Sequence, residues 1–278
     1  MPKKEAVEAV QLSRLQQEVR SLKSQKKSLA QYAETLEKKL DVVTSLRDTI
    51  DTYIIHPKTG RTKSEAAALM VASDWHVEEI VIPQHVSGLN EYSPEIARVC
   101  AERFFTTGRK MIDMFNRDIQ IKTLVLALLG DFFTGSIHEE NAEGNAMRPM
   151  EACLFAQQLI ASGIEYLLQR NGLKIVVVCA VGNHSRITAK IYNANEHGHS
   201  LEYYMYHNLA AHFRSNPRIR FIIPEGYHSY VDVLGTMIRF HHGHSVRYQG
   251  GVGGLYIPMN KAIAQWDKAV KADISVCG

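Results

Sequence analysis

Short apolar runs alternate with helix-like segments over most of this chain, and this alternation is the feature that most constrains its fold. Runs rich in β-formers stand at 67–72, 123–129, 174–180, 219–223 and 230–241, and segments of helical periodicity stand at 94–116, 149–170 and 201–213. Strands that alternate with helices predict a layered α/β sheet. Because ligands in such sheets bind outside the carboxyl ends of the strands, the residues that follow each run are the first candidates for a functional site.

The segment before these runs has a different pattern. A heptad repeat from Leu12 to Ile50 predicts a coiled-coil helix over residues 1–52. Its apolar seam consists of Leu12, Val19, Ala33 and Leu40 at a positions and Leu15, Leu22, Leu29, Leu36, Val43 and Ile50 at d positions. Lys26 and Arg47 also occupy a positions, where charge weakens the seam, so the pattern favours a modest homo-oligomer. The alternative is a long amphipathic helix folded back on its own domain.

Residues 53–66 are interpreted as a basic linker to a domain over 67–278, because they contain Pro57, Gly60 and the cations Lys58, Arg61 and Lys63. The linker is either a contact for phosphate backbones or simply solvated. A formal net charge of +3 does not by itself indicate nucleic acid. The chain start has no apolar signal segment and no apolar run is long enough to span a bilayer, so a cytoplasmic protein without a membrane partner is predicted.

Side chains that can bind metal follow the main apolar runs. They are Asp74 and His76 in Ser-Asp-Trp-His, Asp131 in Gly-Asp, Asn183 and His184 in Gly-Asn-His, and His242 in His-His-Gly-His. Any one of these motifs alone is explained by an ordinary turn. Four unrelated turns are a poor explanation for carboxylate, amide and imidazole groups that recur in this order, each directly after a strand.

This ordered set resembles the signature of the calcineurin-like metallophosphoesterase superfamily: D-x-H, G-D, G-N-H, a later H and a closing G-H-x-H. The resemblance extends from residue 67 to the C-terminus. It implies a four-layer sandwich of mixed β-sheets flanked by helices, and a hydrolase of phosphoester bonds that is a phosphodiesterase or nuclease-like enzyme. Its implied cofactors are two divalent metal ions, manganese first, with iron, zinc, magnesium or nickel as alternatives. The implied partner is a phosphoester substrate, with a weak preference for nucleic acid.

The resemblance also assigns roles to individual residues. Asp74 and His76 would bind the first metal, Asp131 would bridge both, and Asn183 and His242 would bind the second. Carboxylate and imidazole suit cations held about 3.5 to 4 Å apart, where one generates hydroxide and both clamp a phosphate. His184 would be the catalytic residue rather than a ligand, stabilising phosphoryl oxygens or protonating the leaving oxygen.

One block departs from the family pattern, because Ser185 and Arg186 follow Gly-Asn-His where an acidic residue is usual. Either Glu139 or Glu140 supplies the missing outer carboxylate, or His184 is less basic and the enzyme slower. Arg186 is either a contact for the substrate phosphate or a solvent-facing loop residue.

Other histidines and glycines are not predicted to bind the metals. His138, His197 and His199 are expected to line the cleft, and the glycines at 250–254 to form a loop beside the site. Alternation along a strand should direct His241 to the face opposite His242.

Residues 272–277 predict one more short strand that runs into Gly278, where the closing G-H-x-H block would begin. The expectation is that the functional protein continues with His-x-His and that the 278-residue chain alone is inactive; the alternative is a natural terminus. The competing function is a non-catalytic, oligomerising interaction protein with a degenerate phosphoesterase domain.

Overall fold

The computed structural model describes residues 52–56, 64–137, 144–192, 195–247, 250 and 254–278, together with 19, 22–23 and 26–27. The chain divides into two units, Met1–Ile50 and Asp51–Gly278. In the first unit the described residues are helical and exposed. The rest of the predicted coiled-coil seam lies outside the described residues.

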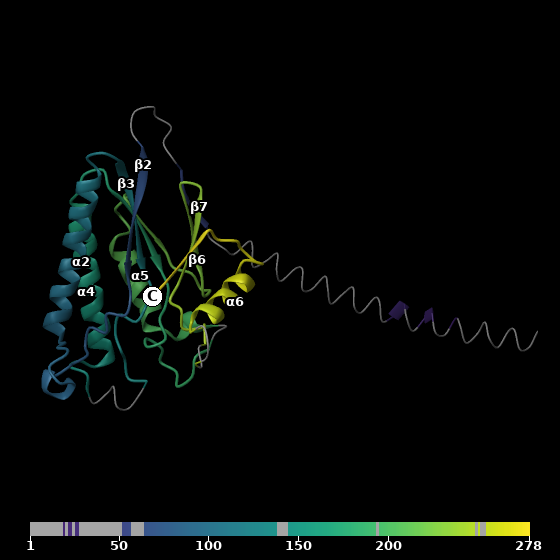
Figure 1. Cartoon of the computed structure of the whole chain (residues 1–278), viewed down its shortest axis with the longest axis horizontal. Helices are drawn as coiled ribbons and strands as arrows, with labels where there is room; N and C mark the ends of the chain where they lie inside the picture. Colours follow the sequence, from purple (N-terminus) through teal and green to yellow (C-terminus); the bar gives the residue numbers. More distant parts are fainter. Residues whose placement is uncertain are drawn as a thin grey trace, which may run out of the picture. The chain divides into compact units, whose positions relative to one another are not determined.

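The second unit has an α/β fold with two four-stranded sheets flanked by helices (Figure 1). The strand order of the parallel sheet is β2 (Glu65–Ala72), β3 (Gln120–Leu128), β4 (Lys174–Cys179) and β5 (Ile219–Ile222). The strand order of the mixed sheet is β1 (Thr52–Ile55), β6 (Ser229–Val233), β7 (Thr236–His241) and β8 (Ile274–Cys277). In the mixed sheet β6 and β7 are antiparallel, whereas β1 runs parallel to β6 and β8 runs parallel to β7.

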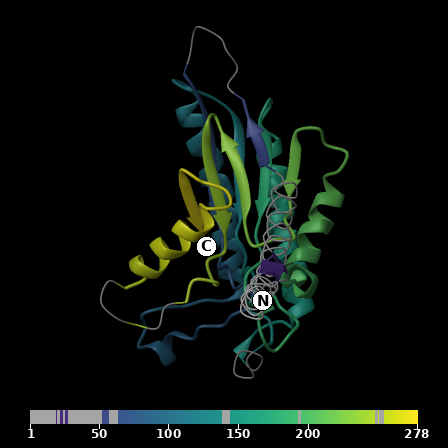
Figure 2. The same cartoon turned by 90° about the vertical axis from the view of Figure 1, so that its right-hand side faces the viewer.

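Helices cover the outer faces of both sheets. The parallel sheet packs against α2 (Pro94–Phe115), α4 (Pro149–Leu168) and α5 (Leu201–His212), and Figure 1 shows α2 and α4 side by side. The start of α2 follows from its sequence, since the Ser93 hydroxyl accepts from the Ile96 amide and a proline stands at the first turn. Helix α6 (Tyr256–Trp266) lies beside β6 and β7 in Figure 2, with its last residue 4.9 Å from His241, ring centroid to ring centroid.

The two sheets enclose a core of their own. Side chains of β3 and β4 meet those of β6 and β7 there, among them Val125, Val176, Val231 and Phe240. The opposite faces of β3 and β4 pack against the helices, so these two strands are buried on both sides. Continuous apolar runs are typical of such central strands in parallel sheets.

Two elements at the start of the second unit differ from the sequence-based expectation. The sequence pattern assigns Thr52 to the end of the coiled-coil helix and residues 53–55 to the linker. Instead, Thr52–Ile55 form strand β1, and Tyr53 and Ile55 pack into the core between the sheets. Strand β2 also starts at Glu65, two residues earlier than predicted. Segment 57–63 of the linker lies outside the described residues. A four-residue strand such as β1 has little periodicity of its own and is stabilised by its partner strand, so its sequence alone does not reveal it.

Within the described part of the chain, no helix combines the length and the apolar character that crossing a bilayer requires.

Candidate metal centre

The predicted site residues lie on loops that leave β2, β3, β4 and β7 at one edge of the fold. The first two loops run together, because the Asp74 amide donates to the Gly130 carbonyl oxygen (2.9 Å) and the His76 amide donates to the Asp131 carbonyl oxygen (3.2 Å). Asp74, His76 and Asp131 all have left-handed backbones, with φ of 54°, 45° and 53°. Aspartate and histidine tolerate this region better than most residues, and such conformations gather at functional sites.

Two glycines bring the loops after β3 and β4 into contact. A β-carbon on Gly130 would lie 2.3 Å from the Gly182 nitrogen, and a β-carbon on Gly182 would lie 2.0 Å from Asp131 Oδ1. Neither separation is sterically possible, so both positions need glycine. These are the glycines of the G-D and G-N-H motifs, and their contact places Asn183 and His184 beside Asp131.

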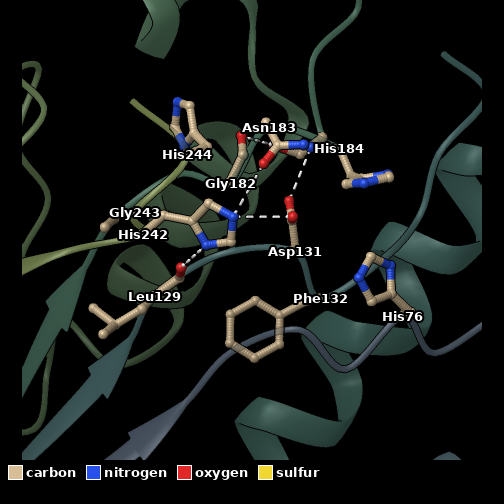
Figure 3. A network of polar contacts seen from close by, with 12 residues as sticks. His76, Leu129, Asp131, Phe132, Gly182, Asn183, His184, His242, Gly243 and His244 are labelled. Atoms are coloured by element: carbon tan, nitrogen blue, oxygen red, sulfur yellow. Dashed lines mark hydrogen bonds and ion pairs between the residues drawn. The ribbon is translucent and has the colours of Figure 1, made fainter. Parts of the chain in front are cut away.

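Asp131 and His242 form a buried ion pair at the centre of the site (Figure 3). His242 Nε2 lies 3.0 Å from Asp131 Oδ2 and 3.2 Å from the Asn183 amide oxygen, while Nδ1 donates to the Leu129 carbonyl oxygen at 2.6 Å. Burial opposes the charge on His242, but the hydrogen bond and charge of Asp131 outweigh it and raise the pKa of His242 to about 9. Although burial alone would raise it, the pKa of Asp131 is lowered, because His242 and the His184 amide stabilise the carboxylate.

Asp74, Asp131 and His242 together make a group suited to a cation. Their ligand atoms all lie within 4.8 Å of one another, with Asp74 exposed and the other two buried. Carboxylate oxygens and an imidazole nitrogen are borderline-to-hard ligands that divalent ions such as Mn²⁺ and Zn²⁺ accept. Asn183 joins the group through its contact with His242. The donor set therefore fits a divalent metal ion.

His76 and His184 stand next to this group rather than within it. Their rings are 5.0 Å apart, centroid to centroid, and nearly perpendicular. In the view of Figure 3 the Asp131 carboxylate lies between the imidazoles of His242 and His76. The structure thus brings all six residues of the predicted metal and catalytic set to one edge, with Asp131 in the middle.

The residues after Gly-Asn-His turn away from the site centre. Ser185 is buried and its hydroxyl contacts the Ser200 hydroxyl at 2.8 Å. Arg186 donates to the carbonyl oxygens of Asn183 and, at 3.1 Å, of Thr188. Its guanidinium therefore braces the Asn183 loop; contact with a substrate phosphate stays a prediction. Glu139 and Glu140, the predicted replacement acids, lie outside the described residues.

Glu202 is a functional residue that the sequence did not reveal. It is fully buried in the first turn of α5, where its two oxygens accept from the amides of Phe132 and Gly182, each at 2.8 Å. Burial, reinforced by the nearby Asp131 charge, raises the pKa of Glu202 to about 7. The carboxylate clamps the loops after β3 and β4 together. An acidic residue at a helix start is commonplace, so no local signal could have identified it.

Two other histidines, His241 and His244, contact residues outside the metal group. His244 forms a buried ion pair with Glu196 of the short 3₁₀ helix η2 (Glu196–His199), at 2.9 Å. His241 points away from the site centre and contacts His228 and Trp266. As expected from strand alternation, the side chains of the neighbouring residues His241 and His242 point to opposite faces of the mixed sheet.

Strand β8 ends beside the metal group. A β-carbon on Gly278 would lie 3.0 Å from His242 Nδ1, 3.0 Å from the Leu129 carbonyl oxygen and 2.9 Å from Ser73 Cβ. The predicted last strand therefore exists and delivers its final residue to the same edge as the other loops.

In comparisons with known proteins, no family model matches the chain, and no curated protein matches it either. The case for a function consequently depends on the geometry of the site.

Proposed function

We propose that this protein is a metal-dependent hydrolase of phosphoester bonds, a phosphodiesterase or nuclease-like enzyme with a two-metal site. The observation that carries the proposal is the convergence of Asp74, Asp131 and His242 within 4.8 Å at the carboxyl ends of strands from both sheets. Asn183 and His76 flank the group on loops that hydrogen bonds fix to it.

In this proposal Asp74 and His76 would hold one divalent cation, Asn183 and His242 would hold the other, and Asp131 would contribute to both. Manganese is the first choice for both positions because the motif resemblance implies it, and the mixed carboxylate, amide and imidazole donors are also compatible with iron, zinc, magnesium or nickel. When bound, such a pair activates water and clamps the oxygens of a phosphate. Ligation through His242 Nε2 requires the neutral imidazole, so cation binding and protonation of His242 are coupled.

His184 supplies proton transfer in this proposal. Its amide donates to Asp131 Oδ1 at 2.8 Å, which fixes the residue next to the bridging carboxylate. Its Nδ1 donates to the Thr134 carbonyl oxygen at 3.1 Å, so Nε2 is the nitrogen that exchanges a proton with a substrate oxygen. An imidazole can both accept and donate a proton, which suits protonation of a leaving oxygen.

The arrangement of layers supports membership in the calcineurin-like superfamily. Helices α2, α4 and α5, the parallel sheet, the mixed sheet and α6 follow one another across the second unit. Two sheets packed face to face with helices outside are the architecture that the motif resemblance implies. A nucleic-acid substrate is the preferred member of the phosphoester class, on the basis of the basic segment at 56–63.

The test is manganese calorimetry together with a substrate panel. The panel compares a generic phosphodiester, a phosphomonoester, cyclic nucleotides and single- and double-stranded DNA, each with Mn²⁺ and with chelator. For the complete protein we expect about two bound equivalents of Mn²⁺ and metal-dependent cleavage of a diester, and Asp131→Asn should lose both. A protein that binds no Mn²⁺ after reconstitution would contradict the proposal and favour the non-catalytic alternative.

The heptad segment is proposed to make the protein a homo-oligomer. The seam from Leu12 to Ile50 is apolar at every d position, which favours self-association. Light scattering of the full chain at micromolar concentration should give the mass of a dimer or trimer. A monomeric mass would instead indicate a helix folded back on its own domain.

A further inference from the structure

We infer that Thr134 is a positioning residue that orients two imidazoles of the site, His76 through its hydroxyl and His184 through its carbonyl. Thr134 lies in the loop after β3 and is 1% exposed. The inference rests on the proposed function, because it assigns His76 to a cation. It adds a hydrogen-bond chain, Glu79–Thr134–His76, to the six residues that the motifs identify.

The direction of this hydrogen-bond chain follows from its donors. The Thr134 hydroxyl donates to Glu79 Oε1 at 2.8 Å and lies 2.8 Å from His76 Nδ1. A hydroxyl has one hydrogen and a carboxylate only accepts, so the hydroxyl must accept from His76 Nδ1–H. The neutral His76 ring therefore carries its proton at Nδ1.

This tautomer prepares His76 for a metal. With Nδ1 protonated, the lone pair of the ring is at Nε2, and that nitrogen becomes the ligand. Histidine ligands commonly donate their other N–H to a carboxylate or carbonyl, which fixes the ring and raises its basicity. Here the carboxylate of Glu79 acts through one intervening hydroxyl; it also lies 3.6 Å from His76 Nδ1.

The carbonyl of the same residue orients His184. Its oxygen lies 3.1 Å from His184 Nδ1, and a carbonyl can only accept. The residue after His184, which is acidic in the motif that this loop resembles, is Ser185 and bonds to Ser200. The Thr134 carbonyl thus holds the tautomer of His184, as an outer carboxylate would.

Backbone contacts place Thr134 independently of its side chain. The Val77 amide donates to the Phe132 carbonyl oxygen at 3.0 Å, and the Gly135 amide donates to Glu78 Oε1 at 2.9 Å. Glu78 is fully buried, and burial raises its pKa despite these hydrogen bonds. Loss of the Thr134 hydroxyl should therefore leave the carbonyl in place, so the two roles can be separated by mutation.

The experiment compares Thr134→Val, which keeps shape and carbonyl, with Thr134→Ser, which restores the hydroxyl. Thr106→Val is the matched control, because that hydroxyl bonds only within α2, to the Glu102 and Arg103 carbonyl oxygens. Mn²⁺ calorimetry should show a loss of affinity of roughly 10- to 100-fold for Thr134→Val and near-normal affinity for Thr134→Ser and for the control.

A second measurement needs no metal. In the metal-free protein, ¹⁵N chemical shifts of the imidazoles should show the Nδ1–H form for His76 and for His184. Thr134→Val should remove this preference at His76 and retain it at His184. Should Thr134→Val fail to fold, Glu79→Gln, on a side chain that is 40% exposed, provides the same comparison with a smaller effect.

The outcomes separate the inference from the proposed function. Unchanged Mn²⁺ affinity in Thr134→Val, when the wild type binds Mn²⁺, overturns the inference and leaves the function intact. A wild type without Mn²⁺ affinity overturns the function and the ligand role of His76 together. An Nε2–H tautomer of His76 in the wild type overturns the hydrogen-bond chain whatever the metal result.

Discussion

His241 and His242 are consecutive in the chain, yet they belong to two regions with opposite electrostatics. On the site face, Asp131 overcomes the effect of burial and raises the pKa of His242 to about 9. On the face beneath α6, burial, reinforced by Arg239, lowers the pKa of His241 to about 4. The nearness of a carboxylate, rather than the depth of burial, therefore decides which of two buried imidazoles is charged.

The face beneath α6 also contains a carboxylate, that of Asp267, but this group forms an ion pair with Arg239. Arg239 is fully buried and its guanidinium contacts Asp267 at 2.6 Å, the Val270 carbonyl oxygen and the Tyr230 hydroxyl. His241 is left between aromatic rings, and neither of its ring nitrogens has a hydrogen-bond partner among the described residues. One face thus holds a charged imidazole beside a carboxylate, and the other holds neutral imidazoles that pack among aromatic rings.

The largest effect should come from removing the carboxylate that distinguishes the two faces. Asp131→Ala should abolish the proposed cleavage and most metal binding, because the proposed bridging ligand is lost, and the pKa of His242 should fall from about 9 towards or below the ordinary value. Calorimetry and an NMR titration of His242 measure both. A His242 pKa that stays near 9 in the variant would mean that another group charges this imidazole.

His184→Ala should separate chemistry from metal binding on the site face. We expect turnover to fall by roughly 10²- to 10⁴-fold, the usual loss of a general acid, while metal content stays nearly complete. Single-turnover kinetics and metal analysis on the same preparation provide the measurement. Loss of the metal in this variant would show that His184 is a ligand and that the assigned roles are wrong.

The face beneath α6 should make the protein sensitive to acid. Since the folded pKa of His241 is about 4 and that of His228 about 3, against an ordinary value of 6.5, the unfolded chain binds protons first as the pH falls. The contribution of these two neutral histidines to the free energy of unfolding is therefore fully present above about pH 6.5. It is lost as the pH decreases towards 4. Between pH 6.5 and pH 4 this loss amounts to about 2 to 3 kcal/mol per histidine.

His241→Phe should reduce that acid loss of unfolding free energy by about 2 to 3 kcal/mol between pH 6.5 and 4. Urea titrations at several pH values measure it, and His85→Ala, at an exposed histidine of the 3₁₀ helix η1 (Pro83–Val86), serves as the control. Equal pH slopes for wild type and His241→Phe would place the acid sensitivity elsewhere.

The smallest effect concerns the spacing of the loops on the site face. Gly182→Ala should push Asp131 away, because the new β-carbon would lie 2.0 Å from its Oδ1. The expected costs are about 1 to 3 kcal/mol of unfolding free energy, as for other overpacked sites, and weaker metal binding. Gly226→Ala is the matched control, since its β-carbon would meet nothing within 4 Å. Equal metal affinity in the two variants would show that close approach of the loops is not needed.

Much of the fold could be predicted because its signals are local. Ser93 and Pro94 mark the start of α2, and the apolar runs of β3 and β4 were placed to within about three residues, since boundaries depend on nearby side chains. Strand β1 and helix α6 were missed. Neither has a buried periodic face strong enough to be recognised without its partner, and α6 has no fully buried residue.

The sequence by itself determined which chemical groups are present and in what order they leave the strands. Asp74, His76, Asp131, Asn183, His184 and His242 were identified from their positions after the apolar runs and from the motif order that resembles the calcineurin-like signature, because α/β sheets bind ligands outside the carboxyl ends of their strands. Only the tertiary structure decided what surrounds them. Glu202 and Thr134 reach the site through packing and hydrogen bonds between loops far apart in sequence, and the charge of His242 depends on a carboxylate 111 positions earlier in the chain.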